Sequence, residues 1–205
     1  MISSKLFFKF TLLLIISLPP STGSAKNILI YGDSLSAAYG MELEQGWAAL
    51  LADKLRGDHT IINASISGET SAGGKARLTI TLNEFAPDLL LLELGANDGL
   101  QGLPISSLKS NLEAMIQEAI AADVTVILGG ISLPASYGPR YIDQFRSVYT
   151  SLAKQYELPF IDFYREDFIT TEGYIQEDGL HPTQITQPIV RDMVMDFLTE
   201  NNLLD

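Results

Sequence analysis

Five short runs of the chain are almost continuously apolar and have the length of β-strands. Strands with one solvent-exposed face alternate between apolar and polar residues, whereas these runs do not, which is typical of parallel strands covered on both sides. The runs are residues 27–30, 59–63, 88–94, 124–128 and 159–162. We therefore expect a five-stranded parallel sheet.

Between these runs, apolar residues recur every three or four positions, the spacing of helices that bury one face. The segments are 47–55, 78–85, one from residue 106 or 107 to 122, 139–157, and a last one after Pro182. For the last helix, Thr183 is the expected cap, and Ile185 and Ile189 belong to the apolar face. Strand–helix alternation with short links predicts an α/β protein. The expected fold is a three-layer α/β/α sandwich around a flavodoxin-like five-stranded parallel sheet, order 2-1-3-4-5.

The first 25 residues have the pattern of a cleaved signal peptide. Lys5 and Lys9 precede an apolar segment, residues 10–18, which is too short to span a bilayer. Small residues up to Ala25 then offer a cleavage site. We expect residues 26–205 to form one domain that is periplasmic or secreted from a bacterium, without a stable membrane anchor.

Composition narrows the classes of function. The chain has no cysteine, which excludes disulfides, thiolate metal sites and a lipid-modified N-terminal cysteine. Its formal net charge of −12 becomes −14 once Lys5 and Lys9 are removed. A strongly acidic protein repels phosphate backbones, so we expect no nucleic-acid partner. The same charge disfavours coenzyme A thioesters as the natural substrate.

Candidate functional residues follow the strands, because ligands of open parallel sheets bind at the carboxyl ends of the strands. Ser34 comes after the first strand, and Gly32 just before it is expected to permit a sharp turn. Gly68 follows the second strand and Asn97 the third. Ordinary turn chemistry is the alternative interpretation of each of these residues.

The histidines narrow the choice of a catalytic base most, since the chain has only two. His59 begins a strand at the opposite end and is interpreted as a surface residue. His181 follows Asp178 by three residues, a spacing that lets the carboxylate contact Nδ1 and leave Nε2 as a base. A serine needs such a base to become a nucleophile. Ser34, His181 and Asp178 therefore form a candidate triad, although an Asp-Gly turn followed by Pro182 would also explain this segment.

Acyl transfer also needs donors for the oxyanion of the tetrahedral intermediate. The backbone N–H groups of Ser34 and Gly68 and the carboxamide of Asn97 are the candidates. The two acids beside these residues, Asp33 and Asp98, are expected to be structural and to accept hydrogen bonds from nearby backbone N–H groups.

These motifs resemble the SGNH (GDSL) hydrolase family in type and order. The residues concerned are Gly32, Asp33, Ser34, Leu35 and Ser36; Gly68; Gly95, Ala96, Asn97 and Asp98; and Asp178, Gly179, Leu180, His181 and Pro182. The chain is most similar to the bacterial periplasmic thioesterase I / lysophospholipase L1 / arylesterase branch. The Gly-x-Ser-x-Gly motif of α/β-hydrolases is absent around Ser34.

The resemblance implies a serine hydrolase of carboxylic esters and thioesters, with arylesterase, lysophospholipase and acyl-thioesterase activities. It assigns Ser34 as the nucleophile, His181 as the base, Asp178 as its partner, and Ser34, Gly68 and Asn97 as oxyanion donors. It implies no metal and no organic cofactor.

Loop residues near the same edge are expected to form an apolar acyl groove. The groove residues are Leu100, Leu133, Pro134 and Tyr137, with Leu103 and Ile131 nearby; alternatively, these side chains only cover the core. Gly99 and Gly102 predict a loop that moves when an acyl chain enters. Lysophospholipids and small esters are the favoured substrates, and a monomer is the default. Two alternatives stay open: a carbohydrate or peptide O-deacetylase, and a flavin- or nucleotide-binding protein of flavodoxin type.

Overall fold

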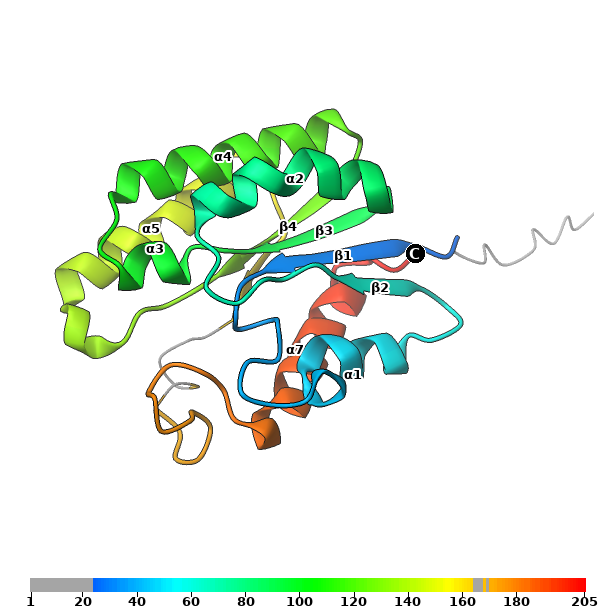
Figure 1. Cartoon of the computed structure of the whole chain (residues 1–205). Helices are drawn as coiled ribbons and strands as arrows, with labels where there is room; N and C mark the ends of the chain where they lie inside the picture. Colours follow the sequence, from blue (N-terminus) through cyan, green and yellow to red (C-terminus); the bar gives the residue numbers. More distant parts are fainter. Residues whose placement is uncertain (1–23, 164–167, 169) are drawn as a thin grey trace, which may run out of the picture.

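The structure is a computed structural model that describes residues 24–163, 168 and 170–205 (Figure 1). The predicted signal peptide therefore lies outside the described residues, except for Ser24 and Ala25. No helix in the described part of the chain is both long enough and apolar enough to cross a membrane.

The central layer is a parallel sheet of five strands in the order β2-β1-β3-β4-β5, which confirms the predicted topology. The strands are β1 (Asn27–Gly32), β2 (Thr60–Asn63), β3 (Leu89–Glu93), β4 (Thr125–Gly130) and β5 (Phe160–Asp162). Every residue of β3 is buried, because this strand is central and both of its faces are covered.

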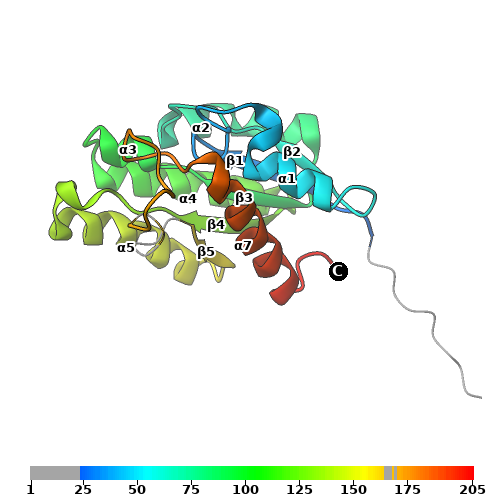
Figure 2. The same cartoon turned by 90° about the horizontal axis from the view of Figure 1, so that it is seen from below.

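Helices cover both faces of the sheet, as the alternating pattern predicts (Figure 1). The helices α2 (Ser71–Phe85), α4 (Ile105–Ala121) and α5 (Pro139–Gln155) lie on one face, and α1 (Trp47–Lys54) and α7 (Gln187–Glu200) lie on the other. Figure 2 shows α7 crossing the sheet on the side that faces the viewer. The start of β1 and the C-terminus lie at the opposite end of the strands from α3 (Ala96–Leu100).

The last helix begins later than the sequence pattern predicts. A 3₁₀ turn, η3 (Gln184–Thr186), precedes α7, and the Thr183 hydroxyl donates to the Gly173 carbonyl instead of capping the helix. Because the tighter turn shifts the helical phase, Ile185 points outward and is 69% exposed. Ile189, 41% exposed, also lies outside the core.

Gly32 is required for a reason other than the predicted turn. Its φ angle is not among the positive ones. A Cβ at this position would lie 2.5 Å from Glu93 Oε2 and 2.9 Å from the Glu93 carbonyl oxygen. The missing side chain therefore lets β1 end directly against a buried carboxyl group of β3.

Candidate active site

Ser34, His181 and Asp178 come together at the carboxyl end of the sheet. The Ser34 Oγ lies 2.9 Å from His181 Nε2, and His181 Nδ1 lies 2.6 Å from Asp178 Oδ2. Ser34 follows β1, whereas the other two residues lie in the turn between β5 and α7. The arrangement of hydroxyl, imidazole and carboxylate is that of a serine nucleophile with its base and orienting acid.

The turn that carries His181 holds Asp178 in place through its backbone. Asp178 Oδ1 accepts hydrogen bonds from the N–H groups of Leu180, at 2.9 Å, and His181, at 3.0 Å. Burial opposes ionisation of Asp178, but the bonds from the His181 ring and from the two N–H groups outweigh it and keep the pKa of this carboxyl below its ordinary value. An ionised Asp178 favours the tautomer with hydrogen on Nδ1, which leaves the Nε2 lone pair facing Ser34.

Two residues that the sequence pattern did not reveal support the imidazole. The ring of Tyr39 stacks on that of His181, with centroids 4.1 Å apart and planes 27° apart. The amide of Gln176 donates to the carbonyls of Tyr39, at 3.1 Å, and Pro182, at 3.0 Å. Gln176 therefore joins the loop after Ser34 to the His181 turn. A tyrosine and a glutamine in loops have no periodic signal that could have identified them.

The three expected oxyanion donors surround the cavity beside Ser34. Ser34, Gly68 and Asn97 all line it, and Gly68 has a φ of +81°, a backbone conformation that favours glycine. Asn97 Nδ2 already donates to Asp33 Oδ2, at 3.1 Å, and to the Glu69 carbonyl, at 2.9 Å. Both hydrogens of the Asn97 amide thus already have acceptors. An oxyanion bound here would share one of these hydrogens with its present acceptor.

Two buried carboxyl groups lie beneath the nucleophile. Asp33 accepts hydrogen bonds from the Leu35 N–H and from Asn97, and Glu93 accepts one from the Ser36 hydroxyl at 2.7 Å. Burial raises the pKa of Asp33 to about 7. It also raises the pKa of Glu93 well above its ordinary value, and the neighbouring Asp33 adds to the shift. The hydrogen bond from the Leu35 N–H confirms the prediction that Asp33 accepts from a nearby backbone N–H.

Asp98 has the structural role expected of it. It is 2% exposed and accepts hydrogen bonds from the backbone N–H of Ser71, at 2.7 Å, and from its hydroxyl, at 2.5 Å. These bonds fix the start of α2 against α3 and so position Asn97, the residue before Asp98.

A cavity of about 700 Å³ opens beside the triad. Leu100, Leu133 and Pro134 line it as expected, together with Ile131. Tyr137 does not line it, because its side chain is directed to the Leu100 carbonyl, to which the hydroxyl donates at 3.0 Å. Leu103, also expected nearby, is 36% exposed and lies outside the lining.

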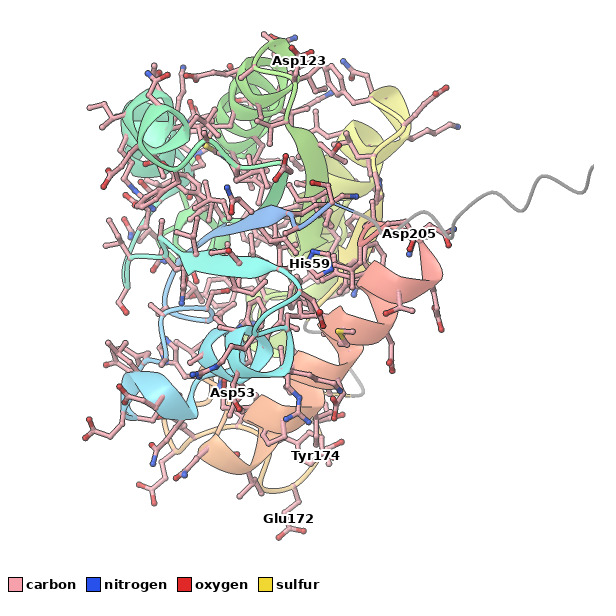
Figure 3. The ribbon with its side chains drawn as sticks, turned by 90° about the vertical axis from the view of Figure 1, so that its right-hand side faces the viewer. Asp53, His59, Asp123, Glu172, Tyr174 and Asp205 are labelled. Carbon is pink, nitrogen blue, oxygen red and sulfur yellow. The ribbon has the colours of Figure 1, made fainter. Side chains whose placement is uncertain are left out.

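His59 lies far from the triad, at the start of β2. Its Nδ1 accepts a hydrogen bond from the backbone N–H of Lys26 at 3.2 Å. Figure 3 looks at the amino ends of the strands and shows His59 there, on the same side as Asp205. Within the described residues, no cluster of three or more His, Cys, Asp or Glu side chains could hold a metal ion.

Comparison with known proteins assigns the chain to a family. The model of the GDSL-like Lipase/Acylhydrolase family matches residues 30–187, which include every candidate triad and oxyanion residue. The chain belongs to this family. It is 46% identical to "Esterase TesA" of Pseudomonas aeruginosa, over 80% of this chain and 84% of the relative. It is 41% identical to "Thioesterase 1/protease 1/lysophospholipase L1" of Escherichia coli, over 82% of this chain and 81% of the relative.

A solved structure supports the same assignment. The psychrotrophic esterase EstA from Pseudoalteromonas sp., inhibited by monoethylphosphonate, is 41% identical and superposes with a TM-score of 0.81. The match covers 85% of this chain and 97% of that one. These similarities lend no support to the alternative of a flavin- or nucleotide-binding protein.

Proposed function

We propose that this protein is a serine esterase that hydrolyses carboxylic ester and thioester bonds of acyl substrates through an acyl-enzyme. The observation that carries the proposal is the 2.9 Å contact between Ser34 Oγ and His181 Nε2, at the edge of a largely apolar cavity. A nucleophile, its base and an acyl-sized space are the three parts that such a reaction needs.

The reaction has two halves. His181 Nε2 takes the Ser34 proton while Oγ attacks the acyl carbonyl carbon, and the oxyanion binds the N–H groups of Ser34 and Gly68 and the amide of Asn97. His181 then gives the proton to the departing alcohol or thiol, which leaves an ester on Ser34. Water, deprotonated by His181, attacks this ester and releases the carboxylic acid. Asp178 stays ionised and stabilises the imidazolium in both halves.

The largely apolar cavity favours longer acyl chains over acetyl groups. Leu100, Ile131, Leu133 and Pro134 in the cavity lining have hydrocarbon side chains, so this part of the wall offers carbon contacts rather than hydrogen bonds. An O-deacetylase needs no such space beyond the acetyl methyl group. We also propose that the protein is exported, because residues 1–25 have the pattern of a cleaved signal peptide.

A series of p-nitrophenyl esters, from acetyl to decanoyl, tests this function. We expect kcat/KM to rise with chain length, since each buried methylene contributes about 0.8 kcal/mol, roughly a fourfold gain. The Ser34→Ala variant should lose several orders of magnitude with every ester. Activity confined to the acetyl ester would favour the deacetylase, and equal turnover by Ser34→Ala would refute the mechanism.

A further inference from the structure

The segment that carries the Gly68 N–H is exposed and follows a strand at the edge of the sheet. Ile66, Ser67 and Gly68 are all exposed, and β2, which precedes them, is an edge strand. A glycine adds conformational freedom to such a segment. An oxyanion donor is nevertheless effective only if it is fixed before the charge forms. A contact outside this segment must therefore hold it in place.

Glu69, the next residue, is joined to two of the three oxyanion donors. Its backbone N–H donates to the Ile66 carbonyl at 3.1 Å, which closes the turn that contains Gly68. Its carbonyl accepts a hydrogen bond from Asn97 Nδ2 at 2.9 Å. A shift of Glu69 would thus displace the Gly68 N–H and release the Asn97 amide.

An ion pair with Arg77 of α2 holds the side chain of Glu69. Arg77 Nε lies 2.5 Å from Glu69 Oε2, and the two side chains are 22% and 11% exposed. Gly73, four positions earlier on the same face of α2, makes room for this contact, because a Cβ there would clash with Glu69 Oε1. An ion pair sheltered from water keeps more of its attraction than one on the surface. Glu69 is therefore fixed to α2.

Arg77 also contacts the strand that leads to the nucleophile. Its Cζ lies 4.0 Å from the centroid of the Tyr31 ring, which is a cation–π contact. Tyr31 is fully buried in β1, three residues before Ser34, and its hydroxyl donates to the Gly74 carbonyl at 2.6 Å. Arg77 Nη2 is buried and has no hydrogen-bond partner among the described residues, so hydrogen bonding alone does not explain the position of this arginine.

We propose that Arg77 and Glu69 are positioning residues for the oxyanion site. Arg77 holds the segment after β2 against β1, and this contact fixes the Gly68 N–H and the Asn97 amide relative to the nucleophile. The inference rests on the proposed esterase function and adds two residues to its machinery. Neither Arg77 nor Glu69 lines the cavity, so both act through the donors beside them rather than on the substrate.

The test measures hydrolysis of p-nitrophenyl butanoate, and inhibition by a trifluoromethyl ketone, in Arg77→Met and in Glu69→Ala. When the ketone binds, Ser34 Oγ bonds to its carbonyl carbon, the hydroxyl proton passes to His181, and the ketone oxygen becomes an oxyanion that needs the same donors. In both variants kcat should fall at least about tenfold while KM changes less than about twofold, because displaced donors weaken the transition state alone. The inhibition constant should rise by the factor by which kcat/KM falls.

Two further substitutions separate charge from geometry and from general effects. Glu69→Gln keeps an acceptor for Arg77 Nε at the same distance from the backbone, so its kcat should stay within about threefold of the wild type. Arg56→Met is the matched control, since it breaks an ion pair with Asp53 whose side chains are 79% and 73% exposed. It should leave kcat, KM and inhibition unchanged.

A double-substitution cycle shows whether Arg77 acts through the oxyanion site. Arg77→Met should cost at least about tenfold in kcat in the wild type but no more than about threefold in Asn97→Ala, because one of the donors that it positions is then already absent. A purely structural role would lower the unfolding temperature and give equal costs in both backgrounds.

Hydrogen exchange supplies a readout apart from activity. The amide of Glu69, which the Ile66 carbonyl holds, should exchange at least about tenfold faster in Arg77→Met, with the amides of β1 and β3 unchanged. If one of the two main variants does not fold, the other decides the test. Wild-type kcat in both, or equal costs in the two backgrounds, would overturn the positioning role. Absence of ester hydrolysis by the wild type would refute the esterase function, and the exchange of the Glu69 amide would then test the anchoring separately.

Discussion

At the scale of single residues, Asn97 has the most demanding position in the site. Its amide donates hydrogen bonds to Asp33 and to the Glu69 carbonyl and must also donate one to an oxyanion. An oxyanion carries a full charge and attracts a donor more strongly than a carbonyl does, so the shared bond should strengthen as the tetrahedral intermediate forms. An interaction that is stronger in the transition state than in the ground state lowers the barrier and leaves substrate binding almost unchanged.

Replacement of Asn97 by alanine should therefore lower kcat by about 10²–10³ with little change in KM. Steady-state kinetics with a single ester measures both constants. Asn83→Ala, at an exposed position of α2, is the matched control and should behave as the wild type. If Asn97→Ala raised KM and left kcat intact, the residue would be a substrate contact rather than an oxyanion donor.

The meeting of Ser34, Asp178 and His181 could be predicted, because the chain has two histidines and parallel strands place their carboxyl ends along one edge. The contacts of Tyr39 and Gln176 with this site could not be predicted. Their contacts join residues 137 positions apart in loops, where no hydrophobic period sets the register. The sequence pattern places Glu93 within an apolar strand, and the structure shows it as a buried acid close to Gly32.

At the scale of elements, α1 and α7 connect the two halves of the triad. The backbone N–H of Trp47, at the start of α1, donates to Gln187 Oε1 at 3.0 Å, and Gln187 Nε2 donates to the Thr183 carbonyl at 3.2 Å. The Trp47 ring N–H donates to the Leu35 carbonyl at 3.2 Å. Since Leu35 follows Ser34 and Thr183 lies two residues after His181, these bonds set the distance between nucleophile and base.

Gln187→Ala should break this connection, because it leaves the buried Trp47 N–H without its acceptor, whereas the Thr183 carbonyl keeps its hydrogen bonds from Thr186. Each unsatisfied buried group costs about 1–3 kcal/mol of stability. A displacement of about 1 Å between Ser34 and His181 would lower kcat by up to about 10². Thermal unfolding and steady-state kinetics measure the two effects.

The control for this variant is Gln184→Ala, since Gln184 is exposed on the adjoining 3₁₀ turn. It should keep both stability and kcat. A Gln187→Ala protein with the kcat of the wild type would show that the two halves of the site are positioned independently of α1 and α7.

The sheet order was predictable because a helix-length segment separates each apolar run from the next, and because right-handed crossovers allow few topologies. The residue at which α7 begins was not predictable. Apolar spacing continues through Ile185 and Ile189, and the sequence does not show that a 3₁₀ turn changes the phase at Gln184.

At the scale of the whole molecule, the buried acids couple stability to pH. Asp33 and Glu93 are both fully buried, and burial raises the pKa of each. The folded protein therefore retains protons that the unfolded chain gives up near pH 4. This stabilisation is fully present below the ordinary carboxyl pKa and is lost as pH rises through the raised values, for Asp33 about 7.

Glu93→Gln keeps the shape of the protonated side chain and cannot ionise. Between pH 5 and pH 8, we expect its free energy of unfolding to fall less than that of the wild type, by at least about 1.4 kcal/mol, the equivalent of one pKa unit. Urea unfolding at both pH values measures this difference. Glu84→Gln, exposed on α2, should keep the wild-type dependence. Identical pH dependence in Glu93→Gln and the wild type would mean that Glu93 is ionised in the fold.

The central claim is that Ser34 is a nucleophile activated by His181. Reaction with an alkyl fluorophosphonate, followed by mass spectrometry of the intact protein and of its peptides, tests this most directly. We predict one adduct per chain, on Ser34, none in Ser34→Ala, and labelling slowed by at least about 10³ in His181→Ala. An adduct on another residue, or equally rapid labelling without His181, would contradict the mechanism.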